Sequence, residues 1–209
     1  MSILNELRSL APQERALAPN EANKVTAERQ ARRFRTLLGY DGEPMLPNDT
    51  LFNLPRIKVM IAVSMIHAGM SGWDHDSRQY QVVINGQDSP ARQRFTLAHE
   101  YKHIVDYTSH ADNYQSFGSY SAHDQAEDIC DYFAACLLMP RHLLMSAWGD
   151  GIQNVQDLAG LFGVSKAAMR VRLRQTGTVP NGRHDQFTRP TPIQIGSLQS
   201  TALPKLEVV

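Results

Sequence analysis

One short segment constrains this chain more than any other: Phe95 to His103, which reads Phe-Thr-Leu-Ala-His-Glu-Tyr-Lys-His. His99 and His103 are four residues apart, and on an α-helix that spacing leaves them about 40° apart around the axis. Their ring nitrogens can therefore reach one metal ion. Glu100 lies about 100° further round, where its carboxylate can reach a metal-bound water. The His-Glu-x-x-His pattern is typical of zinc peptidases, with Glu100 as the general base.

The flanking residues favour a helix that is partly buried. Asp88-Ser89-Pro90 is a typical helix start, because proline suits the first turn. The apolar residues that would bury the helix are Phe95, Leu97, Ala98, Ile104 and Val105. The alternative is a solvated surface helix in which the motif arises by chance.

Two histidines leave a zinc site short of a ligand, since catalytic zinc usually has three protein ligands. The downstream segment from Ala126 to Pro140 carries Glu127 and Asp131, which share one helix face at their four-residue spacing. Spacing alone leaves other roles open. Glu127 can be a capping partner of Asp124, three residues earlier, and Asp131 can be an exposed acid.

Three stretches together resemble the ImmA/IrrE family of zinc metallo-endopeptidases. They are Arg94-Phe-Thr-Leu-Ala-His-Glu100, Glu127 six residues before Phe133-Ala-Ala, and Leu137-Leu-Met-Pro140. The resemblance covers about residues 55–175 and implies a zincin-like fold, a Zn²⁺ cofactor and Glu127 as the third ligand. Asp131 is then a residue that supports a ligand, or an alternative ligand.

The chain departs from that family at two places. Tyr101-Lys102 stands where the family usually has Leu-Gly, which predicts different packing behind the helix. Cys130-Asp131 stands where Ala-Asn is common. Neither change removes a proposed zinc ligand.

The elements before the motif indicate an α+β fold. Glu21 to Leu38 has helical amphipathic spacing, and Gly39 suits its end. Ile57 to Val63 and Tyr80 to Ile84 are strand-like. We expect them to form a small antiparallel sheet, along whose edge such peptidases can hold substrate as an added strand. Residues 40–54 and His67 to Ser77 read as loops, with His67 and His75 as loop histidines.

The segment from His110 to His123 is polar and aromatic and would border the metal as a loop. A tyrosine or histidine there can stabilise the oxyanion of a tetrahedral intermediate. The candidates are His110, Tyr114, Tyr120 and His123. Each of them can equally be an ordinary loop residue.

Residues 155–174 resemble a helix-turn-helix. Ala159 and Gly163 suit the tight turn, and Ser165 can cap the second helix. If the segment binds DNA, the groove-facing charges are Lys166, Arg170, Arg172 and Arg174. The alternative is a helical pair that packs against the peptidase core.

Composition limits the partners. Lys and Arg together number 21, as do Asp and Glu, so a global basic field for nucleic acid is absent. Neither a signal-peptide pattern nor an apolar run of membrane-spanning length is present, which predicts a cytoplasmic protein without a membrane partner. Cys130 and Cys136 form no redox or zinc motif.

These observations predict four parts: a helical segment and loop (1–54), a zincin-like core (55–147), the helix-turn-helix-like segment (148–176) and a mobile or docking tail (177–209). The family resemblance implies limited cleavage of a regulatory protein, such as a helix-turn-helix repressor, in stress response or mobile-element control. The alternatives are a DNA-binding or partner-binding regulator with a structural or sensory zinc site, and a pseudo-protease that only binds its partner.

Overall fold

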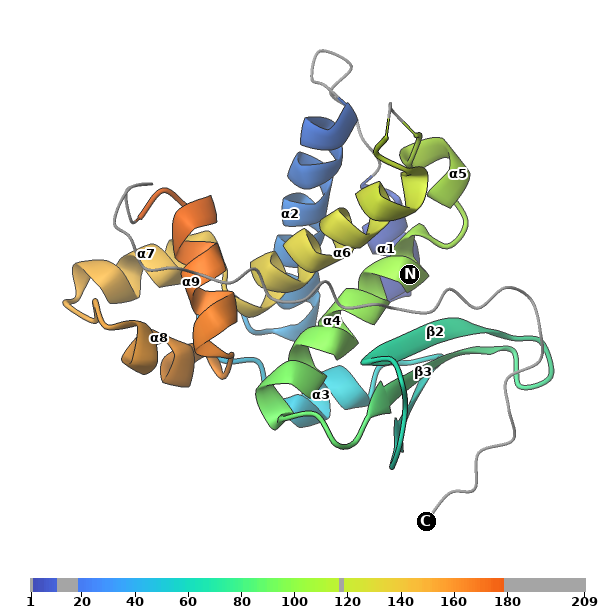
Figure 1. The fold of residues 1–209 in the computed structure, drawn as a ribbon, viewed down its shortest axis with the longest axis horizontal. Helices are drawn as coiled ribbons and strands as arrows, with labels where there is room; N and C mark the ends of the chain where they lie inside the picture. The colour runs from blue at the N-terminus through green and yellow to red at the C-terminus, as the bar shows by residue number, and fades with distance from the viewer. Residues whose placement is uncertain (1, 11–18, 117–118, 179–209) are drawn as a thin grey trace.

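A computed structural model describes residues 2–10, 19–116 and 119–178 (Figure 1). In chain order the elements are α1 (Ile3–Arg8), α2 (Pro19–Leu38), α3 (Asn48–Phe52), β1 (Ile57–Ala62), β2 (Gly69–Asp74), β3 (Gln79–Asn85), α4 (Pro90–Asp106), α5 (His110–Asn113), α6 (Ala122–Leu138), α7 (Arg141–Gly149), α8 (Val155–Phe162) and α9 (Lys166–Gln175). The predicted α+β class is confirmed. The predicted 177–209 tail lies outside the described residues from 179 onward.

The sheet is mixed, so the expectation of a purely antiparallel sheet is wrong. Its order is β1-β3-β2, with β1 parallel to β3 and β2 antiparallel to it. The expected loop at His67 to Ser77 is also wrong, because β2 occupies most of it. Two glycines and the absence of β-branched residues hide this strand from the sequence pattern. Since β2 reverses the chain once, β3 returns in the direction of β1.

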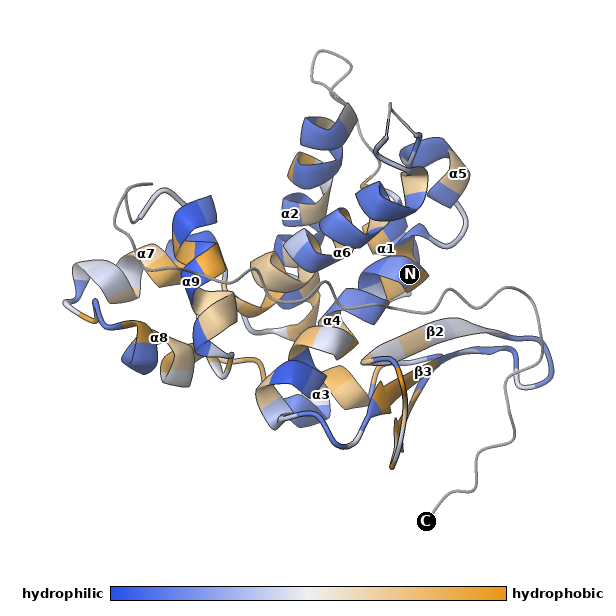
Figure 2. Cartoon of the chain, in the orientation of Figure 1, coloured by the Kyte–Doolittle hydropathy of each residue, from blue (hydrophilic) through white to orange (hydrophobic). Residues whose placement is uncertain are grey.

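The C-terminal half of the central strand β3 is hydrophobic, whereas the β2–β3 connection is hydrophilic (Figure 2). Val82 and Ile84 of β3 are fully buried. Helix α4 packs against β2 and β3, and α6 packs against both α4 and α2. The sheet and the α7–α9 group thus lie at opposite sides of the molecule, with α2, α4 and α6 between them (Figure 1).

Helix α4 begins as its sequence predicts. Ser89 is the N-cap and its hydroxyl accepts a hydrogen bond from the Arg92 amide, while Pro90 occupies the first turn. The buried face continues through the motif, because α4 lies between the sheet and α6. The predicted motif helix is therefore confirmed, and it is a core helix rather than a solvated surface helix.

The two residues that replace Leu-Gly in α4 are both buried. The Tyr101 hydroxyl donates to the carbonyl of Leu51, which ties α4 to α3. The Lys102 ammonium donates to Asp106 at 2.7 Å and to the Gln30 side chain at 2.8 Å. A buried charge of this kind is tolerated because it is paired and hydrogen-bonded.

Two predicted loops contain short helices. Residues 40–54 include α3, and the segment between α4 and α6 includes α5. Each helix is only about one turn long, so it leaves little periodic signal in the sequence. Among the described residues, no helix is long and apolar enough to cross a membrane.

Candidate metal centre

Three side chains from two packed helices meet at one point. His99 and His103 project from α4, and their Nε2 atoms are 3.0 Å apart. Glu127 projects from α6, with one carboxylate oxygen 3.2 Å from His103 Nε2 and the other 3.5 Å from His99 Nε2. The contact between α4 and α6 therefore brings Glu127 to His99, although the two residues are 28 positions apart in the sequence.

The spacing of these atoms fits a zinc ion. Ligand atoms held at about 2.0–2.1 Å in a tetrahedral arrangement lie about 3.3–3.4 Å from one another. The three observed separations, 3.0, 3.2 and 3.5 Å, bracket that value. Two imidazoles with one carboxylate is a donor set found in catalytic zinc sites, and it leaves a fourth position for water or substrate.

The start of α6 explains why Glu127 is available for this role. Ser121 and Asp124 form the capping box: the Asp124 amide donates to the Ser121 hydroxyl, and the Ser121 amide donates to the Asp124 carboxylate. Ser121 is therefore the N-cap of α6, Asp124 is its partner in the capping box, and Glu127 takes no part in the cap. Glu127 lies one turn further along, facing α4.

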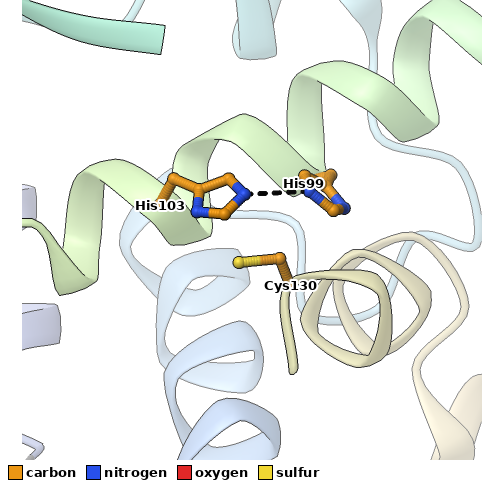
Figure 3. A group of neighbouring side chains, drawn as sticks. All are labelled: His99, His103 and Cys130. Atoms are coloured by element: carbon orange, nitrogen blue, oxygen red, sulfur yellow. Dashed lines mark hydrogen bonds between the residues drawn. The ribbon is translucent and has the colours of Figure 1, made fainter. Parts of the chain in front are cut away.

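Cys130 is a second potential ligand on α6. Its thiol sulfur and one ring nitrogen of each of His99 and His103 all lie within 4.8 Å of one another (Figure 3). We favour Glu127 as the third ligand, because its oxygens already approach both Nε2 atoms at tetrahedral spacing. Burial also raises the pKa of the Cys130 thiol well above its usual range, which opposes formation of the thiolate.

Asp131 lies behind His99 rather than at the metal position. Its carboxylate is 2.7 Å from His99 Nδ1, the ring nitrogen that does not face His103. Burial alone would lower the pKa of His99, but the hydrogen bonds with Asp131 and Glu127 outweigh it and raise the pKa to about 10. For Glu127, burial would raise the pKa, yet hydrogen bonds with His103 and His99 lower it to about 2.

Glu100 is buried beside this cluster, and neither of its carboxylate oxygens has a hydrogen-bond partner among the described residues. A buried carboxylate without a hydrogen-bond partner is costly, so Glu100 is expected to interact with a group that is not part of the protein chain. A water on a metal held by His99, His103 and Glu127 is a group of that kind.

Gly69 at the start of β2 leaves the room that Glu100 occupies. A Cβ atom at Gly69 would lie 3.1 Å from Glu100 Oε1 and 2.4 Å from Thr96 Cγ2. The sequence pattern did not single out this glycine, because its importance depends on how closely β2 approaches α4. A glycine inside a strand is the only local signal for such a close approach.

The four predicted oxyanion candidates differ in their distance from the metal-binding side chains. Tyr114 is buried and its hydroxyl donates to Asp106, so the expectation of a loop residue at the metal is wrong for it. His123 is exposed, 3.8 Å from Glu127, and Tyr120 donates to Asp128 at 2.5 Å, both at the N-terminal end of α6. His110 is exposed and stacks edge-on against Tyr114. His123 is thus the candidate with a direct contact to the site.

The helix-turn-helix-like geometry is present in α8 and α9. Gly163 ends α8 in the left-handed conformation, and Ser165 caps α9. Lys166 and Arg174 are exposed and Arg170 is half-buried. Arg172 is buried and donates to the Met139 carbonyl, so its predicted place among the groove-facing charges is wrong.

Comparison with known proteins identifies relatives of this chain. Residues 57–174 match the IrrE N-terminal-like domain family. The radiation response metalloprotease IrrE of Deinococcus deserti is 29% identical over 126 residues, which cover 57% of this chain and 45% of that protein. The matched region therefore spans less than half of that relative.

A solved structure shares the fold. It is described as a Mycobacterium tuberculosis transcriptional regulator, and it superposes with a TM-score of 0.58 at 15% identity, over 83% of this chain and 52% of that chain. At this identity the likeness concerns the fold alone.

Proposed function

Because the chain belongs to the IrrE N-terminal-like domain family of peptidases, we propose that it is a zinc-dependent endopeptidase that makes limited cuts in a regulatory protein. His99, His103 and Glu127 would hold the Zn²⁺, and Glu100 would act as the general base. Zinc with an open coordination position lowers the pKa of a bound water to about 7 and polarises the carbonyl of the substrate.

The observation that carries this proposal is that the Glu100 carboxylate is buried beside the two histidines with no hydrogen-bond partner in the described part of the chain. A structural zinc site needs no such carboxylate. Glu100 follows a ligand directly in sequence, so it is held on α4 next to the position where water would be activated. Its role is to accept the proton of that water and to pass it to the leaving amine.

The sheet edge offers a place for the substrate. β2 is an edge strand, it pairs with β3 on one side only in the described part of the chain, and it packs against α4. An extended peptide that pairs with the other side of β2 would run past Glu100, which lies beside Gly69. The substrate class that fits is therefore an extended, accessible segment of a protein.

We further propose that the substrate is a helix-turn-helix transcriptional repressor, cut during stress response or in the control of a mobile element. The family resemblance of the motifs supports this part of the proposal. The reaction would take place in the cytoplasm, where such repressors act.

The test compares wild type with Glu100→Gln on a helix-turn-helix repressor that the wild-type protein cleaves. The amide keeps the size of the carboxylate but cannot accept a proton, and a positioned general base contributes typically about 10²–10⁴-fold to rate. We expect equal zinc content, retained repressor binding and cleavage at least about 100-fold slower. Glu21→Gln, an exposed glutamate on α2, is the matched control. Equal cleavage by Glu100→Gln and wild type would refute the mechanism.

A further inference from the structure

A cavity lies away from the metal centre, between α2, the C-terminal end of α6, α7 and α9. Its volume is about 500 Å³, within the range of about 300–1,000 Å³ that small-molecule sites occupy. Five arginines from three helices line it: Arg29, Arg32 and Arg35 of α2, Arg141 of α7 and Arg172 of α9. No sequence motif links them, and the proposed peptidase reaction uses none of them.

Two of these arginines form the buried wall of the cavity. Arg35 and Arg172 are 1% and 2% exposed. Arg35 donates to the carbonyls of Tyr40, Leu137 and Glu43, and Arg172 donates to the carbonyl of Met139. Leu137 and Met139 end α6, so both guanidiniums also meet the negative end of that helix.

These carbonyl groups accept hydrogen bonds from the Arg35 and Arg172 guanidiniums, but they carry no full negative charge. A guanidinium has five N–H donors, and the side chains that Arg172 meets, Gln175, Tyr132 and Cys136, are all uncharged. Within the described part of the chain, no carboxylate lies within ion-pairing distance, 4.0 Å, of any of the five arginines.

The acids of the cavity do not balance its arginines. Glu28 and Asp41 are its only carboxylates among the described residues. The Glu28 carboxylate accepts from the Tyr132 hydroxyl and the Asp41 carboxylate accepts from the Thr36 hydroxyl, while Asp41 and nearby Glu43 offset part of the charge of Arg35. Burial lowers the pKa of Arg35 to about 10, a value at which the group is still charged at neutral pH. Buried cations in such surplus are costly unless an anion joins them.

The remaining wall combines apolar side chains with Cys136 and His142. Val25, Pro140 and Met145 line the cavity beside the arginines. A ligand that fits this lining has an anionic head for several guanidiniums and a small apolar or aromatic part. Phosphate matches arginine best, because its oxygens accept paired hydrogen bonds from the planar guanidinium.

We propose that this cavity binds a phosphorylated small molecule, with its phosphate groups held by the five arginines. A nucleic-acid backbone fits less well, because Arg35 and Arg172 lie below the surface, where a duplex cannot follow them. Arg29, Arg32 and Arg141 are at the rim or near it, and they would close the phosphate from the solvent side.

Calorimetric titration of the full-length zinc-loaded protein with pyrophosphate and, separately, with ADP tests this site. We expect saturable binding of at least one of the two. Arg32→Glu and Arg141→Glu should each weaken it about tenfold or more, since a hydrogen bond to a charged group contributes about 1.5–3 kcal/mol. Both positions are exposed and without an ion pair among the described residues, so both variants should fold.

The matched control is Lys58→Glu, which makes the same charge change on the exposed face of β1 and should leave the affinity unchanged. Tighter binding of ADP than of pyrophosphate would show that the nucleoside contacts the apolar wall. Equal binding would show that only the phosphate groups contribute to the affinity.

Three results would overturn the proposal. The first is the absence of saturable binding of both ligands. The second is binding that Arg32→Glu and Arg141→Glu leave intact, because a phosphate on the zinc ion would behave in that way. The third is loss of duplex DNA affinity in these variants when neither small ligand binds, which would make the arginines a nucleic-acid surface.

Discussion

The carboxylate of Asp131 lies 2.7 Å from Nδ1 of His99, and the other nitrogen of that ring, Nε2, lies 3.0 Å from His103. An Nδ1–H that donates to Asp131 leaves the lone pair of Nε2 directed at the metal position. Carboxylates placed in this way fix the tautomer and the orientation of a histidine ligand. Asp131 is therefore a positioning residue in our proposal.

We expect Asp131→Ala to weaken zinc binding by about 10–100-fold, which is the usual cost of removing such a partner. Competition with a chelator of known zinc affinity measures this loss. Asp128→Ala is the matched control, because Asp128 is an exposed acid on the same helix that pairs with Tyr120 instead. An unchanged affinity in Asp131→Ala would contradict the positioning role.

Glu127→Ala should lose most of its zinc, whereas Cys130→Ala should retain about one zinc per chain. The reason is that the Glu127 oxygens lie 3.2 and 3.5 Å from the Nε2 atoms of His103 and His99, while burial raises the pKa of the Cys130 thiol and so disfavours the thiolate. Zinc analysis after dialysis checks both variants. A cobalt-substituted protein with a strong thiolate-to-metal charge-transfer band would instead make Cys130 a ligand.

Gly69→Ala should abolish or strongly reduce cleavage and destabilise the fold by about 1–3 kcal/mol through overpacking. Its new methyl group would meet Thr96 and Glu100. Urea unfolding and the repressor assay measure the two effects. Gly42→Ala is the control, since nothing lies within 4 Å of a Cβ atom there.

Adding Thr96→Ser to Gly69→Ala should restore part of the stability, because it removes the methyl group that the new side chain meets first. Stability of Gly69→Ala equal to that of Gly42→Ala would show that β2 and α4 are further apart than described.

Leu158→Ala should cost about 2–5 kcal/mol of unfolding free energy, as expected for a fully buried leucine. Lys166→Ala on the exposed side of the neighbouring helix should change stability by less than about 0.5 kcal/mol. Chemical denaturation compares the two. If Lys166→Ala instead removed salt-dependent binding to a specific DNA, the helical pair would be a DNA reader rather than part of the core.

The sequence by itself determined the local features of this protein. The spacing of His99, Glu100 and His103 requires only one helix, and Ser89 with Pro90 marks where that helix begins. Ser165 and Gly163 likewise define the turn and cap of the α8–α9 pair. Such signals are readable because helix periodicity and capping involve residues at most a few positions apart.

Only the tertiary structure decided which distant residues meet. β2 is recognisable through its pairing with β3, and the need for glycine at position 69 comes from the approach of α4. The same holds for the burial of Arg172, for the position of Cys130 beside the histidines, and for the gathering of five arginines from separate segments into one cavity. These relationships depend on packing between elements, and packing is a property of side-chain shape and burial that no single stretch of sequence contains.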